Sequence, residues 1–254
     1  MTAKPAIPAS PGAGPIARRV VLLRRPPPPE ARGPRRKLLL GELSAWVEPL
    51  ARLFARPLVL PRTARPRVVM LLPGFGTHPL RMRYMARRLE RAGHKVKRWG
   101  LGFNLGPTEN NFALLEERVR QIRARYGQDV VLVGWSLGGI FARELAKRHP
   151  DLVAKVVTMG TPFSGSLYAN NAWRIYQLVT GHSIDQPPIE AQVSLKPPVE
   201  TVALWSPRDG VIAPRSACGR RGERDRATAL RCTHLGFAHS AEAIRAVFEE
   251  LERN

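Results

Sequence analysis

One stretch limits the possible folds more than any other part of the sequence: residues 130–146, which read VVLVGWSLGGIFARELA. Four apolar residues lead into Gly134-Trp135-Ser136-Leu137-Gly138-Gly139, and a helix-like pattern follows. A continuously apolar strand is typical of a parallel sheet that is buried on both faces. A lone serine between glycines at the end of such a strand indicates either a tight turn or a nucleophile raised above the sheet edge.

Short apolar strands alternate with amphipathic helices from Arg67 onward. The strand patterns fall at 67–72, 94–100, 130–135, 153–159, 201–206 and near 228–233, and the helix patterns at 80–93, 108–127, 137–149 and 240–252. This alternation predicts an α/β fold, with a mostly parallel sheet of about six strands and helices on both faces. Residues 67–254 therefore form the predicted folded domain.

The N-terminal part of the chain has a different composition. Residues 1–36 are rich in Pro and Arg, which predicts a disordered basic tail because such a segment buries little apolar surface. Residues 37–66 predict an amphipathic segment that either packs on the domain or lies on an anionic membrane. Its apolar positions near helical spacing are Leu39, Leu43, Trp46, Val47, Leu50, Leu53 and Phe54, and Glu42, Arg52 and Arg56 are expected to face away.

The chain is strongly basic, with 41 Lys and Arg against 20 Asp and Glu. Residues 1–67 hold 14 of those basic residues and 3 of the acidic ones. This charge favours contact of residues 1–60 with anionic membrane, although a genome that prefers Arg explains it equally well. Nucleic acid is not an expected partner, because no basic and aromatic binding module is present. The oligomeric state is not predicted.

No stretch has the length and apolar character of a secretion signal or a membrane span. The expected location is therefore the cytoplasm, with peripheral membrane contact as an addition. Cys218 and Cys232 do not make a disulfide framework, and with His234 they are a weak zinc pattern that lacks a fourth ligand. We therefore expect free thiols, no metal and no cofactor.

A serine nucleophile needs a base and an acid that orients the base. His234 follows the last predicted strand and precedes a Gly-containing loop and the final helix, which favours it as the base over His239. Asp209 follows the strand at 201–206 in a turn and is the favoured acid. Weaker candidates for the acid are Asp185, Glu223 and Asp225.

The loop after the first strand, LLPGFGTHP (71–79), is flanked by glycines. Such a loop leaves backbone N–H groups free to point into a site at the carboxyl edge of the sheet. We expect the N–H groups of Phe75 and Leu137 to bind a developing oxyanion. A turn without a catalytic role is the alternative.

Several motifs in order resemble those of the lipase/esterase branch of the α/β-hydrolase superfamily, over about residues 67–252. They are PGFG (73–76), GWSLGG (134–139), MGTPFSGS (159–166), SPRDGVIAP (206–214) and THLGF (233–237). The resemblance implies a triad of Ser136, Asp209 and His234, with oxyanion donors at Phe75 and Leu137. It also implies a short cap, at about 162–198. Pro73 departs from the His that many esterases have before the oxyanion-loop glycine.

The implied function is cleavage of carboxylic esters of small molecules or lipids by a serine hydrolase, through an acyl-enzyme. Two alternatives stay open: an acyltransferase that uses the same triad, and a hydrolase-fold protein that acts mainly by binding membrane. Apolar cap residues either line an acyl pocket or only cover the sheet. The predicted pocket residues are Trp135, Phe163, Tyr168 and Trp173. The sequence does not identify the substrate.

Overall fold

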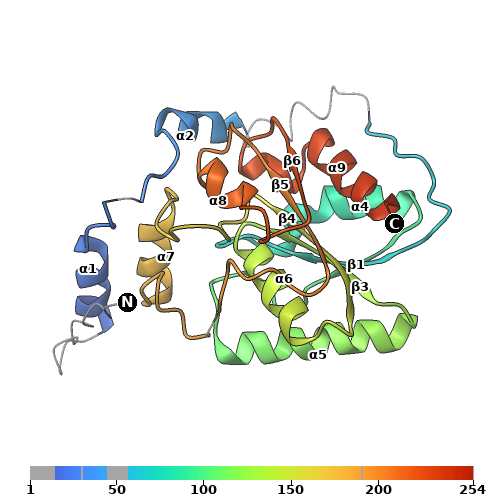
Figure 1. The fold of residues 1–254 in the computed structure, drawn as a ribbon, viewed down its shortest axis with the longest axis horizontal. Coiled ribbons are helices and arrows are strands. Elements are labelled where there is room, and N and C mark those ends of the chain that lie inside the picture. Colours follow the sequence, from blue (N-terminus) through green and yellow to red (C-terminus); the bar gives the residue numbers. More distant parts are fainter. Residues whose placement is uncertain (1–14, 30, 45–56, 190, 254) are drawn as a thin grey trace.

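The computed structural model describes residues 15–29, 31–44, 57–189 and 191–253. A six-stranded sheet forms its centre, in the spatial order β2-β1-β3-β4-β5-β6, and every neighbouring pair is parallel (Figure 1). The predicted α/β fold with a parallel sheet of about six strands is confirmed. The strands are β1 (Val68–Leu72), β2 (Lys95–Arg98), β3 (Val130–Trp135), β4 (Val153–Met159), β5 (Glu200–Trp205) and β6 (Arg226–Ala229).

Helices cover both faces of this sheet (Figure 1). Alternate strand residues pack to opposite sides: Val69 and Leu71 of β1 lie in a core with residues of α4 and α9, while Val68 and Met70 lie in a core with residues of α5 and α6. The helices are α1 (Pro15–Arg24), α2 (Lys37–Glu42), η1 (Pro79–Met82), α4 (Arg83–Arg91), α5 (Glu109–Tyr126), α6 (Leu137–Arg148), α7 (Trp173–Thr180), α8 (Pro214–Cys218), η2 (Leu235–Ala238) and α9 (Ala241–Glu252).

The N-terminal segment differs from the sequence expectation where the structure describes it. Helix α1 forms within the part predicted to be a disordered tail, and it lies beside α7 (Figure 1). The contact includes a hydrogen bond, because Gln177 Nε2 donates to the Leu22 carbonyl at 2.9 Å. A basic Pro-rich composition therefore did not preclude order here, since α7 supplies a surface for the helix. Residues 1–14 and 45–56 lie outside the described residues.

Helix α2 also reverses the expected pattern of burial. Leu43, expected on the packed face, is 60% exposed, whereas Glu42, expected to face away, is 7% exposed. A carboxylate is buried at low cost only when polar partners replace water, and Glu42 has three backbone N–H partners. The amphipathic pattern therefore gave the wrong orientation for this helix.

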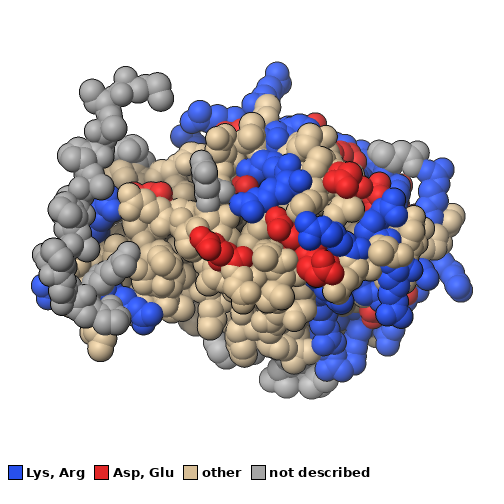
Figure 2. All heavy atoms as spheres, turned by 90° about the horizontal axis from the view of Figure 1, so that it is seen from below, with Lys and Arg blue, Asp and Glu red and all other residues tan. Residues whose placement is uncertain are grey.

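Basic residues are not confined to the N-terminal segment. Figure 2 shows Lys and Arg gathered most densely toward the right of the view, with Asp and Glu among them, and a broad area toward the left with few charged residues. None of the helices in the described ranges combines the length and the apolar character that crossing a bilayer requires.

Candidate active site

Ser136 lies at the sharp turn between β3 and α6. Its backbone has φ 54° and ψ −123°, and it is the only non-glycine residue with positive φ among the described residues. Such a conformation costs on the order of 1–3 kcal/mol and persists only where the surrounding structure imposes it. This conformation places the Ser136 side chain at the carboxyl edge of the sheet, where it lines a cavity.

Two glycines make this turn possible because neighbouring backbone comes too close for a side chain. A Cβ on Gly134 would lie 2.4 Å from the Gly138 carbonyl oxygen, and one on Gly138 would lie 2.3 Å from that of Leu72. The Gly-x-Ser-x-Gly spacing thus lets α6 begin directly against the ends of β1 and β3.

The predicted base and acid meet in the structure. The Nδ1 atom of His234 lies 2.8 Å from Oδ2 of Asp209, and both side chains are buried. The other Asp209 oxygen accepts the backbone N–H groups of Val211 at 2.8 Å and Ile212 at 2.7 Å, so the carboxylate is fixed from behind. A carboxylate on Nδ1 requires a proton there, which leaves Nε2 of the neutral ring as the proton acceptor.

The pKa of His234 is raised above its ordinary value. Burial alone lowers this pKa, but the nearby charge of Asp209, the Asp209 hydrogen bond and the charge of Glu42 raise it by more. The net effect favours the imidazolium, the form that a general base takes after it has accepted a proton.

Trp135 connects the base to the serine turn. Its indole Nε1 donates to the His234 carbonyl at 3.0 Å, and the centres of the two rings are 5.8 Å apart. Since Trp135 directly precedes Ser136 in the chain, this contact anchors the His234 segment at the turn that carries the serine.

The other candidates for acid and base are engaged elsewhere. Asp185 contacts Ser183 and Arg25, Asp225 accepts from Lys196 Nζ at 2.9 Å, and Glu223 accepts the Arg220 N–H at 2.6 Å. His239 is buried at the end of η2, where its backbone N–H donates to Gly236 at 3.0 Å. The ring that contacts Asp209 is that of His234.

The loop after β1 lies against the serine turn. A Cβ on Gly74 would lie 3.3 Å from Ser136 Cβ, so this loop borders the nucleophile. Neither the Phe75 N–H nor the Leu137 N–H donates a hydrogen bond to another group in the part of the chain that the structure describes. An N–H group that binds an oxyanion must be unoccupied in this way.

Asn104 holds this loop in place, and sequence reasoning missed it. It is fully buried, its Nδ2 donates to the Pro73 carbonyl at 2.7 Å, and its backbone carbonyl accepts the Gly76 N–H at 2.7 Å. These two hydrogen bonds fix the loop at Pro73, the position where the sequence differs from the resembled esterases. Asn104 lies in a loop without helical or strand periodicity, so no pattern in the sequence pointed to it.

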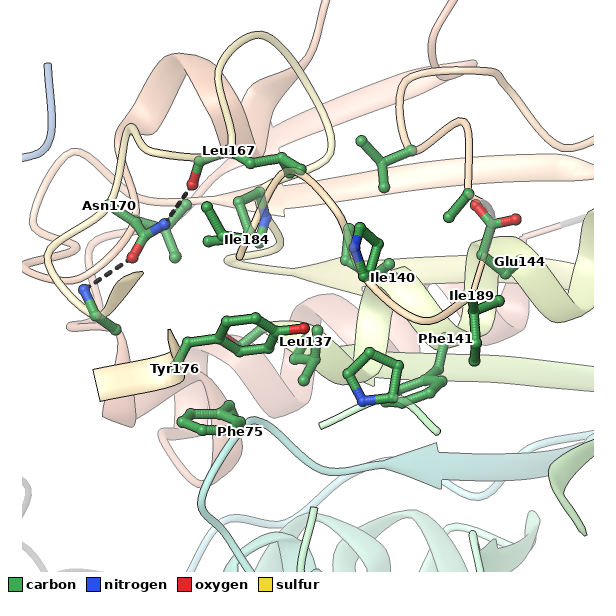
Figure 3. A pocket seen from close by; sticks show the side chains of 18 of the residues that line it. Phe75, Leu137, Ile140, Phe141, Glu144, Leu167, Asn170, Tyr176, Ile184 and Ile189 are labelled. Atoms are coloured by element: carbon green, nitrogen blue, oxygen red, sulfur yellow. Dashed lines mark hydrogen bonds between the residues drawn. The ribbon is translucent and has the colours of Figure 1, made fainter. Parts of the chain in front are cut away.

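An apolar cavity of about 110 Å³ opens beside Ser136. One face of α6 lines it with Leu137, Ile140, Phe141 and Glu144, at helical spacing (Figure 3). Opposite lie Phe75 and, from α7, Tyr176, whose rings are 5.3 Å apart. Burial raises the pKa of Tyr176 to about 12, so its hydroxyl stays neutral.

The four predicted pocket residues do not line this cavity. Trp135 bonds to His234, and Phe163 is covered by Arg143, whose guanidinium lies 4.2 Å from the ring centre. Tyr168 and Trp173 pack on each other edge to face, with ring centres 5.3 Å apart. These four aromatic residues serve the core instead, and the helical periodicity after Ser136 was the signal for the part of the lining that α6 supplies.

The described part of the chain contains no group of three His, Cys, Asp or Glu side chains placed to hold a metal ion. Cys218 and Cys232 are not paired with each other in the structure.

Comparison with known proteins supports the fold. A family model described as the alpha/beta hydrolase fold matches residues 67–180, which include the serine turn. The mature lipase BlEst2 of Bacillus licheniformis has a similar structure, with a TM-score of 0.53 over 78% of this chain and 96% of that one, at 16% identity. At that identity the likeness shows the fold alone.

Two curated relatives are pimeloyl-[acyl-carrier protein] methyl ester esterases. The protein from Vibrio vulnificus (strain YJ016) is 32% identical over 108 residues, which are 42% of this chain and 40% of the relative. The protein from Vibrio cholerae is 36% identical over 66 residues, which are 26% of this chain and 25% of the relative. This chain thus matches less than half the length of these relatives.

Proposed function

We propose that this chain, which has the α/β-hydrolase fold, is a serine hydrolase that cleaves carboxylic esters through an acyl-enzyme. One observation carries the proposal: the strained Ser136 lines an apolar cavity at the turn to which Trp135 anchors His234, and His234 is bound to Asp209. The relatives that match part of the chain are esterases, which supports the same reaction class.

In the proposed mechanism, Ser136 Oγ attacks the ester carbonyl while His234 Nε2 takes its proton. The Phe75 and Leu137 N–H groups then stabilise the oxyanion by about 3 kcal/mol for each donor. Asp209 holds the ring in the required tautomer and stabilises the imidazolium. His234 returns the proton to the leaving alcohol, and water activated by the same ring releases the acid and frees Ser136.

The cavity indicates which acyl groups fit. Glu144 is the only charged residue among the described residues that line it, and it lies two turns along α6 from Ser136, about 12 Å away. Lys147 Nζ contacts its carboxylate. A neutral hydrocarbon chain matches the lining, whereas a chain that ends in a carboxylate loses its hydration there and finds no free cation among the described residues, because Lys147 is already paired with Glu144.

A series of aryl esters of increasing acyl length tests this function with purified protein. We expect hydrolysis of neutral acyl chains, and a kcat/KM at least about tenfold lower for a chain of equal length that ends in a carboxylate. The Glu144→Gln variant is expected to reduce this difference because it frees the Lys147 ammonium to attract the terminal carboxylate. Absence of hydrolysis for every ester in the series contradicts the proposed function. Equal kcat/KM values for the neutral chain and for the chain that ends in a carboxylate contradict the proposed pocket.

The pH dependence follows from the raised pKa of His234. Only the neutral ring can accept the serine proton, so a raised pKa moves the acidic limb of kcat/KM to higher pH. We expect this limb above the ordinary histidine value of 6.5, and we expect it to move downward in Asp209→Asn. A wild-type limb below 6.5 would show that the Asp209 charge does not act on the catalytic base.

Contact with anionic membrane through residues 1–60 remains a proposal. The basic charge of the chain supports it. In the described part of that stretch, α1 lies against α7 and Glu42 is buried, so those elements are already engaged with the domain.

A further inference from the structure

Glu42 connects the N-terminal segment to both loops of the candidate triad. Its Oε1 accepts the backbone N–H of Gly210 at 2.9 Å and that of His234 at 2.8 Å. Its Oε2 accepts the Leu235 N–H at 2.8 Å. One carboxylate, 192 residues before the base, thus bonds to the residue after the acid, to the base itself and to the residue after the base.

The packing around Glu42 shows that α2 packs closely on the loop that carries Asp209, called the acid loop below. A Cβ on Gly210 would lie 2.6 Å from the Leu38 carbonyl oxygen. Asn171 Nδ2 donates both to the Pro34 carbonyl at 3.3 Å and to the Gly210 carbonyl at 2.8 Å. The segment 31–44 therefore contacts the acid loop through both backbone and side-chain atoms, and the Glu42 hydrogen bonds are part of this packed interface.

Two carboxylates act on the His234 ring in the described part of the chain, Asp209 from the loop after β5 and Glu42 from α2. Burial lowers the pKa of His234, and both charges raise it. Glu42 does not contact the ring nitrogens in this arrangement: its bonds are to the backbone. Glu42 therefore acts on the base in two ways: it fixes the backbone at His234, and its charge raises the pKa of the ring.

We propose that Glu42 is a positioning residue that locks the Asp209 and His234 loops together, which makes the N-terminal segment 31–44 part of the catalytic apparatus. Charge-assisted hydrogen bonds to buried backbone N–H groups are among the stronger polar contacts in proteins, so one side chain can fix two loops. The kinetic consequences rest on the proposed ester hydrolysis, whereas the coupling between Glu42 and His234 does not.

The test compares Glu42→Gln with wild type and with Glu249→Gln, which removes the same charge from an exposed position on α9. A glutamine keeps the shape but places an NH₂ group where one oxygen accepts. We expect kcat to fall about tenfold with KM within about twofold, because the acyl cavity is untouched. The acidic limb of kcat/KM is expected to move to lower pH. Glu249→Gln is expected to match wild type in each of these measurements.

An NMR titration of the His234 ring in the same three proteins gives a readout that needs no substrate. The His234 pKa is expected to be lower in Glu42→Gln than in wild type and unchanged in Glu249→Gln. If no ester is hydrolysed by wild type, the proposed function fails while this titration still decides the role of Glu42.

The Glu42→Asp variant covers the case in which Glu42→Gln does not fold, as judged by circular dichroism. It keeps the charge on a shorter side chain that cannot reach both loops, so we expect a lower kcat with an acidic limb close to that of wild type. An unchanged His234 pKa in folded Glu42→Gln, or a kcat within twofold of wild type in both Glu42 variants, overturns the proposal.

Discussion

Replacing Ser136 with alanine is expected to lower kcat for ester hydrolysis by about 10⁵- to 10⁶-fold, the loss found when a triad nucleophile is removed. This corresponds to about 7–8 kcal/mol of barrier. The oxyanion donors and the cavity remain in the variant, so a slow reaction with water and a near-normal affinity for the substrate should persist.

Folding must be unaffected for this result to be interpreted. Alanine at φ 54° carries the same backbone strain as serine, so we expect an unchanged far-ultraviolet circular dichroism spectrum and a similar urea midpoint. Steady-state kinetics on a neutral ester measures the loss. A variant that keeps more than about a hundredth of the wild-type kcat would place the nucleophile elsewhere.

Replacing Gly138 with alanine is expected to have the largest effect on stability among the substitutions considered, a loss of about 3 kcal/mol in the free energy of unfolding. The new Cβ would lie 2.3 Å from the Leu72 carbonyl oxygen and 2.6 Å from that of Pro73. Both atoms belong to the backbone, so helix α6 itself must move away from the end of β1.

Gly127→Ala is the matched control for this substitution. Gly127 ends α5 with φ 64°, and no atom from outside its immediate chain neighbours lies within 4 Å of the position that a methyl group would take there, among the described residues. Alanine at this position therefore meets only the left-handed backbone cost of about 1 kcal/mol. Urea unfolding of the two variants separates close packing from conformational preference. Equal losses in both variants would mean that α6 tolerates the shift and that the close approach at Gly138 is not needed for the fold.

Helices and strands that have a regular hydrophobic pattern and recognisable end residues could be predicted from the sequence. The helix expected at 108–127 begins after Thr108, whose side chain accepts the Asn111 N–H at 3.0 Å, and ends at Gly127. The strand expected at 130–135 has those bounds in the structure. These signals are local, so they did not depend on knowledge of the tertiary fold.

The order of Ser136, Asp209 and His234 was predictable for a related reason. Each residue follows a predicted strand, and the carboxyl ends of parallel strands meet at one edge of a sheet. The contact between Asp209 and His234 agrees with that expectation, while their roles in catalysis stay a prediction until variants are measured.

Hydrogen bonds from a side chain to backbone groups far away in the chain could not be predicted. Glu42 has a polar side chain in an otherwise apolar pattern, and only the backbone N–H groups of Gly210 and His234 explain its burial. Asn104 has the same character, since its partner is the Pro73 carbonyl in another loop. Side chains that satisfy distant backbone groups have no periodicity, so they appear only once the fold is known.

The most direct test of the central claim is the site of covalent labelling by a fluorophosphonate, read by peptide mass spectrometry. We expect one adduct per chain on Ser136, no adduct in Ser136→Ala, and much slower labelling in His234→Gln because the hydroxyl loses its base. An adduct on another residue, or equally fast labelling of His234→Gln, would contradict this claim.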